Sequence, residues 1–149
     1  MSKLVEVIKA DTIKAMKAKE KLKVDTLRMV TAALQNKKIE KRDELTDDEV
    51  ISVLMTLSKQ RKDSIEQFKK GGRDDLADKE SAELVIIQGY LPAQMSEEEV
   101  REVVKEVIAA TGAASPGDMG KVMGQVMGRL KGKADGKMIN AMVRELLGA

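Results

Sequence analysis

Apolar side chains recur every three or four residues along nearly the whole chain, a period typical of amphipathic α-helices. Before Pro92 the pattern predicts four helices, the first over about residues 2–19. Thr46 and Glu49 are spaced as a capping box that begins the third helix, and Gly71-Gly72 ends it. The predicted inward positions of the four helices are Leu4, Ile8 and Met16; Leu27, Val30 and Leu34; Val50, Leu54, Leu57, Ile65 and Phe68; and Leu76, Leu84, Ile87 and Leu91.

Three further helices are predicted after Pro92, because proline ends the helix before it. Ser96 and Glu99 repeat the capping-box spacing, and Gly112 ends the helix that they begin. Ser115-Pro116 is typical of an N-cap followed by proline at the first helical position, and Asp135 is the predicted cap of the last helix. The inward positions of the first and last of these helices are Val100, Val103, Val104, Val107 and Ile108, and Ile139, Met142, Val143 and Leu146.

These patterns predict an all-α protein with two domains. The one short apolar run that would also suit a strand, residues 84–87, lies inside a helical pattern. We expect residues 1–91 to form a bundle of about four helices and residues 92–149 to form a smaller three-helix domain. The charges support this division, since residues 92–118 hold 2 basic and 6 acidic groups whereas residues 119–149 hold 6 basic and 2 acidic groups.

The segment 119–131 combines three kinds of side chain on one predicted helix. Its glycines, Gly120, Gly124 and Gly128, recur along one flank and cost about 1 kcal/mol each relative to alanine. We expect them to serve helix packing, because glycine lets another backbone approach closely. A polar and basic row of Lys121, Gln125 and Arg129 lies on the other side. The predicted buried stripe is Met119, Val122, Met123, Val126, Met127 and Leu130.

The basic row continues into Lys131-Gly132-Lys133, which we expect to be a flexible loop. The row is either a solvated helix face or a surface that binds phosphates, as lysine and arginine do in nucleic-acid complexes. Residues 92–149 contain no aromatic side chain on which unpaired bases would stack, so contact with the backbone and shape of folded RNA is favoured. The candidate nucleic-acid-binding residues are Lys121, Gln125, Arg129, Lys131, Gly132, Lys133 and Lys137.

The composition excludes several kinds of chemistry. The chain has no Cys and no His, so it contains neither a disulfide nor a Ser-His-Asp triad nor a Cys-His pair. We predict no catalytic residue, no cofactor and no metal site, and we expect a cytoplasmic protein. Glu6, Lys9 and Asp11 interrupt the N-terminal apolar pattern, which argues against a signal peptide. No stretch approaches the roughly 20 apolar residues of a membrane span, so we expect no membrane partner.

Two charged runs are interpreted as structural. The densest carboxylate cluster lacks the order of an EF-hand, and we predict that it forms a loop and a helix N-terminus, where acidic groups are favoured by the helix dipole. Lys59-Gln60-Arg61-Lys62 is predicted to be an exposed helix face, and Arg73 is placed to pair with Asp74 or Asp75. The residues of the carboxylate cluster are Glu40, Asp43, Glu44, Asp47, Asp48 and Glu49.

Together these motifs resemble the YqeY family, over essentially the whole chain. The resemblance implies a likeness to the C-terminal helical region of GatB, a subunit of the amidotransferase that converts misacylated Glu-tRNA(Gln) or Asp-tRNA(Asn) with glutamine. In GatB the corresponding tail domain contacts the tRNA body, away from the chemistry. The stretches that carry the resemblance are Lys59-Gln60-Arg61-Lys62-Asp63-Ser64-Ile65 with Phe68 and Gly71-Gly72-Arg73; Tyr90-Leu91-Pro92; and Met119-Gly120-Lys121-Val122-Met123 with Lys131-Gly132-Lys133-Ala134-Asp135.

The resemblance implies a bacterial accessory protein, with the basic positions Lys121, Arg129, Lys131 and Lys133 as tRNA contacts. The family label is carbon–nitrogen ligase activity with glutamine as amido-N-donor. This activity would belong to the amidotransferase complex, because a chain of this length has no counterpart of the metal and ATP sites of GatB. One departure is Gly136, where the GatB-like pattern tends to have proline.

Three hypotheses follow. The first is a tRNA-binding module without its own active site. The second is a protein-interaction module, without nucleic-acid contact, whose glycine flank and Met stripe receive a helix from an amidotransferase or aminoacyl-tRNA synthetase subunit. The third is an amidotransferase that acts alone.

Overall fold

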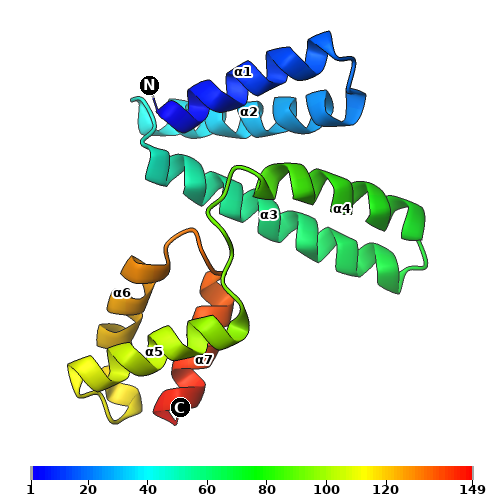
Figure 1. Cartoon of the computed structure of the whole chain (residues 1–149). Coiled ribbons are helices and arrows are strands. Elements are labelled where there is room, and N and C mark those ends of the chain that lie inside the picture. The colour runs from blue at the N-terminus through cyan, green and yellow to red at the C-terminus, as the bar shows by residue number, and fades with distance from the viewer. Residues whose placement is uncertain (1, 149) are drawn as a thin grey trace. The chain divides into compact units, whose positions relative to one another are not determined.

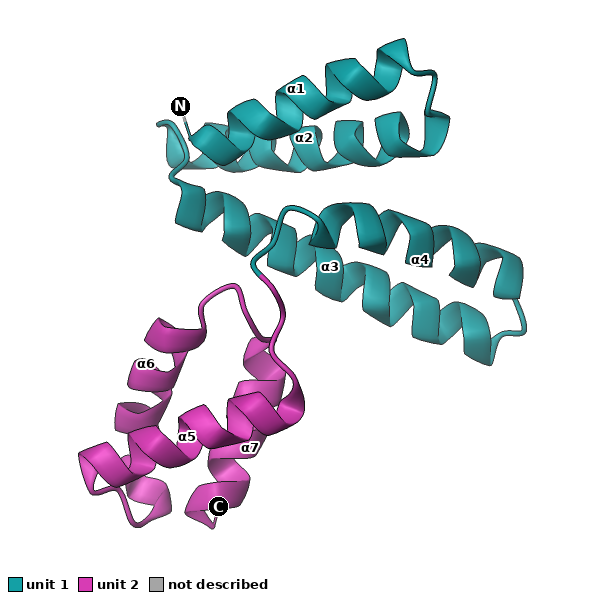
Figure 2. Cartoon of the chain, viewed as in Figure 1, with its two compact units in different colours: residues 1–92 teal, residues 93–149 magenta. Residues whose placement is uncertain are grey.

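The computed structural model describes residues 2–148, which form seven α-helices and one 3-10 helix with no β-strand among them (Figure 1). This confirms the predicted all-α class. The chain divides into two compact units, Met1–Pro92 and Ala93–Ala149 (Figure 2). None of the described helices combines the length and the apolar character needed to cross a bilayer.

The first unit consists of two helical hairpins, one formed by α1 (Lys3–Lys17) and α2 (Lys21–Lys41), the other by α3 (Asp47–Lys70) and α4 (Asp74–Gln88) (Figure 1). Residues 84–87 are helical, as predicted. The prediction for Met16 is wrong: its exposed fraction is 49%, and Ala15 takes the buried place on α1. The buried core is formed by Ile8, Leu27, Val30, Leu34, Leu45, Val50, Leu54, Leu57 and Ile87.

The carboxylates around residues 40–49 hold the start of α3 in place. The capping box of Thr46 and Glu49 is confirmed, with Glu49 N 3.2 Å from Thr46 Oγ1. Lys41 Nζ lies 2.6 Å from Glu49 Oε1, and this contact is the main reason why the pKa of Glu49 falls to about 2. Asp47 accepts hydrogen bonds from the Ser2 hydroxyl and the Leu4 amide, which lower its pKa. Asp43 and Glu44 lie between the two helices and Asp47, Asp48 and Glu49 lie in the first turn of α3, as predicted, whereas Glu40 belongs to α2.

Arg61 contradicts the prediction that the Lys59-Gln60-Arg61-Lys62 run is an exposed face. Its side chain is only 15% exposed, and its Nε lies 3.1 Å from Glu80 Oε2 and 2.9 Å from Glu83 Oε2 on α4. Its guanidinium also contacts the sulfur of Met29 on α2. Arg61 therefore joins three helices of the first unit, whereas Lys59 and Lys62 are exposed as predicted.

Tyr90, two residues beyond the end of α4, is tied to α1. Its hydroxyl donates a 2.7 Å hydrogen bond to Asp11 Oδ2, across 79 positions of sequence. Burial and, second, the Asp11 carboxylate both disfavour the phenolate and raise the pKa of Tyr90 well above its usual value. The contact explains why the Tyr90-Leu91-Pro92 motif joins the end of α4 to the core, where Leu91 is half-buried.

This contact predicts the alkaline behaviour of the protein. Because the raised pKa belongs to the folded state, the stability that Tyr90 contributes is complete below the unfolded pKa of 10.0 and is lost as the pH rises further. We expect Asp11→Asn to lower the pKa of Tyr90 only in part, since burial is the larger cause. Ultraviolet absorbance of the phenolate measures this directly, because Tyr90 is the only tyrosine in the chain. An unchanged pKa in Asp11→Asn would contradict the assignment.

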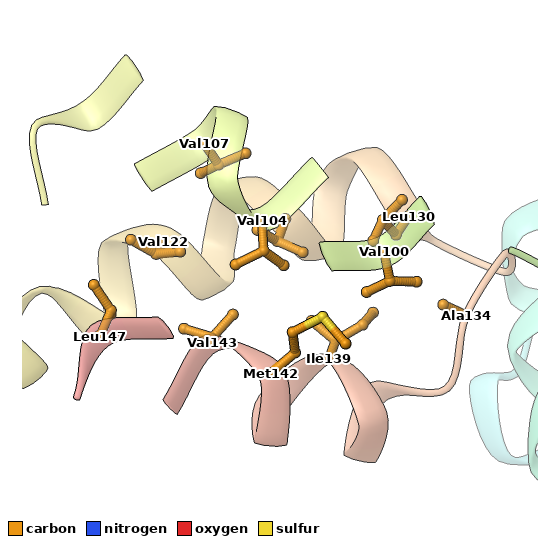
Figure 3. Close-up of a cluster of buried hydrophobic side chains, with 11 residues drawn as sticks. Val100, Val104, Val107, Val122, Leu130, Ala134, Ile139, Met142, Val143 and Leu147 are labelled. Atoms are coloured by element: carbon orange, nitrogen blue, oxygen red, sulfur yellow. The ribbon is translucent and has the colours of Figure 1, made fainter. Parts of the chain in front are cut away.

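The second unit packs α5 (Glu97–Thr111), α6 (Met119–Leu130) and α7 (Gly136–Leu147) around a core rich in valine (Figure 3). The capping box of Ser96 and Glu99 is confirmed, as is the cap by Asp135. Ser115 is an N-cap and Pro116 the first helical residue, as predicted, but the helix that they begin is a 3-10 helix (Pro116–Asp118) that precedes α6. The buried residues are Val100, Val104, Val107, Val122, Val126, Leu130, Ala134, Ile139, Met142, Val143 and Leu147.

Candidate nucleic-acid interface

The turn formed by Lys131-Gly132-Lys133 is anchored, which contradicts the expectation of a flexible loop. Gly132 is buried and adopts φ +75°, a conformation that favours glycine. Its carbonyl accepts a 2.8 Å hydrogen bond from Gln94 Nε2, and the carbonyl of Lys133 accepts another of 2.8 Å from the amide of Met95. The side chains of Lys131 and Lys133 remain exposed on either side of the buried glycine.

Sequence reasoning missed the contribution of Gln94 and Met95 to this turn. They lie 38 positions away from their partners, and neither residue belongs to a pattern that predicts contact with a glycine turn. The contacts place the beginning of the second unit beside the end of α6. The turn is therefore positioned by hydrogen bonds to its backbone from the Gln94 side-chain amide and the Met95 backbone amide.

The basic row on α6 is exposed but partly engaged within the unit. Arg129 Nη1 lies 3.3 Å from Glu106 Oε2 on α5, and both side chains are more than half exposed. Lys121 Nζ lies 3.4 Å from the carbonyl oxygen of Thr111 at the end of α5. Gln125 is exposed between them. Because a surface ion pair contributes little, about 0–1 kcal/mol, a stronger anion can displace Glu106 from Arg129.

The glycine flank of Gly120, Gly124 and Gly128 is open to solvent, and the predicted role in helix packing is wrong. All three residues are exposed, and a Cβ atom added at any of them would meet no atom within 4 Å beyond its chain neighbours and the backbone of its own helix. Met127, which was predicted to be buried, lies beside this flank on the helix and is 41% exposed. Packing inside the second unit therefore does not explain why α6 has three glycines.

The remaining candidate, Lys137, lies in the first turn of α7. Its amide donates a 3.0 Å hydrogen bond to the capping carboxylate of Asp135, and its side chain is exposed. Gly136 begins α7, and a Cβ atom there would be 3.7 Å from Met127 Cε, an ordinary van der Waals distance. Position 136 is therefore not one that requires glycine.

The structure is thus that of an all-α protein whose separate three-helix unit presents a rigid basic turn beside an uncovered glycine flank. Residues 5–147 match the family described as Yqey-like protein, and the chain belongs to this family. The predicted resemblance is confirmed over nearly its full length.

Curated relatives match part of this chain. Altered inheritance of mitochondria protein 41, mitochondrial, from Eremothecium gossypii is 41% identical over 87 residues, which are 58% of this chain and 48% of that protein. The protein of the same name from Kluyveromyces lactis is 40% identical over 98 residues, 63% of this chain and 53% of that protein. The chain spans about half the length of the curated relatives that it matches.

These relatives correct two expectations. Each is named as a mitochondrial protein, which contradicts the prediction of a cytoplasmic protein. They come from yeasts, so the bacterial origin implied by the resemblance is unsupported. Their shared name states no ligand and no reaction, and it therefore assigns no function to the candidate interface.

Proposed function

We propose that the chain is an accessory protein that binds tRNA and is related to the glutamine-dependent tRNA amidotransferases, without an active site of its own. In this proposal Lys131 and Lys133 contact phosphates from their anchored turn, and Lys121, Arg129 and Lys137 extend the contact along α6 and α7. Gln125 and the backbone of Gly132 complete the surface. The carbon–nitrogen ligase activity associated with this kind of protein would belong to a complex of several subunits.

The uncovered glycine flank is the observation that carries the proposal. Three exposed glycines in one helix cost stability, and no neighbour within the second unit uses the space that they leave. A partner that approaches the backbone of α6 closely would use it. The flank lies next to exposed cations, so a phosphate backbone suits it in charge as well as in shape. The lack of aromatic side chains in this unit favours recognition of folded RNA over single strands.

Reversing the charge of the turn is expected to weaken tRNA binding and to change its salt dependence. In Lys131→Glu with Lys133→Glu, two phosphate contacts are lost, so the slope of log affinity against log salt should become shallower by about 2. Electrophoretic mobility shifts with unmodified tRNA at several salt concentrations measure both effects. Binding by the unaltered chain that does not depend on salt, or no binding, would overturn the proposal.

Two further variants make this experiment specific. Lys105→Glu with Arg144→Glu changes the net charge equally at exposed sites elsewhere in the second unit, and it should leave the slope unchanged. Glu106→Gln removes the carboxylate beside Arg129 and should strengthen tRNA binding, because the Arg129 guanidinium then contacts a phosphate without first releasing a carboxylate. Equal losses in both charge-reversal pairs would show that only the net charge matters.

A protein partner is the second candidate, and the exposure of Met127 beside the glycine flank favours it. A helix from an amidotransferase or aminoacyl-tRNA synthetase subunit would pack its apolar face on Met127 and approach the glycines. Gly124→Leu should abolish capture of such a subunit while leaving the unit folded, since space is open at this position. Capture that survives reversal of Lys131 and Lys133 but is lost in Gly124→Leu would favour a protein over tRNA.

A further inference from the structure

The end of the α1–α2 hairpin carries an excess of positive charge as large as that of any eleven-residue stretch of the chain. Residues 13–23 hold five lysines and one acidic residue, Glu20, an excess equal to that of the whole segment 119–149. Lys14, Lys17, Lys19 and Lys21 are exposed, and none of them forms an ion pair within residues 2–148. In this respect they differ from Arg129 of α6, which has a carboxylate beside it.

Apolar side chains are exposed among these lysines. Ile13 is 55% exposed, Met16 49% and Leu22 39%, and the described residues contain only seven large apolar side chains with comparable exposure. Single exposed apolar residues are ordinary, but three of the seven lie within these eleven positions. The hairpin end therefore combines apolar side chains with uncompensated cations.

The shape of this end suits a flat partner. α1 ends at Lys17, α2 begins at Lys21, and Lys19 between them adopts φ +58°, so the chain reverses within a few residues. Figure 1 shows this connection at the end of the hairpin opposite the N-terminus. The short connection makes this end of the hairpin a tip. This tip can meet a plane with its lysines and its apolar side chains at the same time.

We infer that the end of the α1–α2 hairpin binds the surface of an anionic lipid bilayer. The lysine ammonium groups would contact lipid phosphates, with their aliphatic stems along the apolar boundary, while Ile13 and Met16 enter it. An RNA partner would use the cations alone, because aliphatic side chains do not stack on bases as aromatic ones do. This inference is independent of tRNA binding by the second unit.

The inference departs from the expectation of no membrane partner, which rested only on the lack of a spanning segment. A protein that lies on a bilayer needs no such segment, since apolar insertion and attraction to anionic headgroups together hold it there.

Co-sedimentation of the full chain with vesicles tests the inference. We expect binding to vesicles of phosphatidylcholine with phosphatidylserine, little binding to phosphatidylcholine alone, and weaker binding at high salt. Replacing Lys14, Lys17 and Lys21 by glutamine should lower the affinity at least about tenfold. Ile13→Gln with Met16→Gln should also lower it several-fold, and both residues are exposed enough for the unit to tolerate the change.

A matched variant replaces Lys59, Lys62 and Lys69 by glutamine, which removes the same charge from exposed positions on α3 and should leave vesicle binding unchanged. Fluorescence of Tyr90 verifies that the first unit of each variant is folded. Equal binding to neutral and anionic vesicles would overturn the inference, and so would equal losses in the two lysine variants. Vesicle binding unaffected by Ile13→Gln with Met16→Gln, together with tRNA binding lost in the hairpin lysine variant, would identify this end as a nucleic-acid contact instead.

Discussion

Arg61→Ala is expected to destabilise the first unit by about 3 kcal/mol. Arg61 is the cation between Glu80 and Glu83, at 3.1 Å and 2.9 Å, and all three side chains are less than a quarter exposed. Without it, two carboxylates of one helix would face each other with little solvation and no counter-charge. The loss therefore comes mainly from the charges left behind.

Urea unfolding followed by Tyr90 fluorescence measures this loss, because the chain has no tryptophan and its single tyrosine lies in the first unit. Lys62→Ala is the matched control on the same helix, and as an exposed residue it should change the stability by no more than about 0.5 kcal/mol. Adding Glu80→Gln and Glu83→Gln to Arg61→Ala should restore part of the stability. If Arg61→Ala behaved like Lys62→Ala, the ion pairs would have no structural role.

Replacing Gly120, Gly124 and Gly128 together by alanine is expected to stabilise the second unit by about 3 kcal/mol and to weaken its binding to tRNA. Each glycine in a helix interior costs about 1 kcal/mol relative to alanine, and beyond the chain neighbours and the backbone of α6 none of the three added methyl groups meets an atom within 4 Å. The same methyl groups would hold a phosphate backbone away from α6. Stability and binding should therefore change in opposite directions.

Circular dichroism during urea unfolding measures the gain in stability, and mobility shifts with tRNA measure the loss in binding. Gly112→Ala is the matched control, because Gly112 ends α5 with φ +68° and alanine there is strained, so this variant should be destabilised. A triple variant that is more stable and binds tRNA as well as the unaltered chain would remove the main support for the proposed interface.

The helices and most of the core could be predicted because short-range rules determine them. A capping box is predicted wherever two suitable residues are three positions apart. Both predicted boxes, Thr46 with Glu49 and Ser96 with Glu99, are present. The buried residues of α2 and α7 follow the helical period equally well. Such features depend on interactions within one or two turns, which the sequence displays directly.

The errors arose where distant segments decide the outcome. The period places Met16 and Met127 close to the apolar face, but the edge of that face is set by which neighbouring helices reach it, and these two side chains are only partly covered, with exposed fractions of 49% and 41%. The local pattern predicts that Arg61 is exposed, because its partners Glu80 and Glu83 belong to another helix and are not visible in that pattern. The glycine flank was assigned to packing for the same reason, since the sequence does not say which side of α6 its neighbours occupy.

The anchored Lys131-Gly132-Lys133 turn also bears on the thermodynamics of association. Ordering a mobile loop costs conformational entropy, and this cost is subtracted from the binding free energy when the ordering accompanies binding. Here the hydrogen bonds from Gln94 and Met95 fix the backbone of the turn when the second unit folds. Only the two lysine side chains then lose freedom on contact with a ligand. A small number of cations can consequently support recognition that a disordered segment of the same charge would achieve only with more contacts.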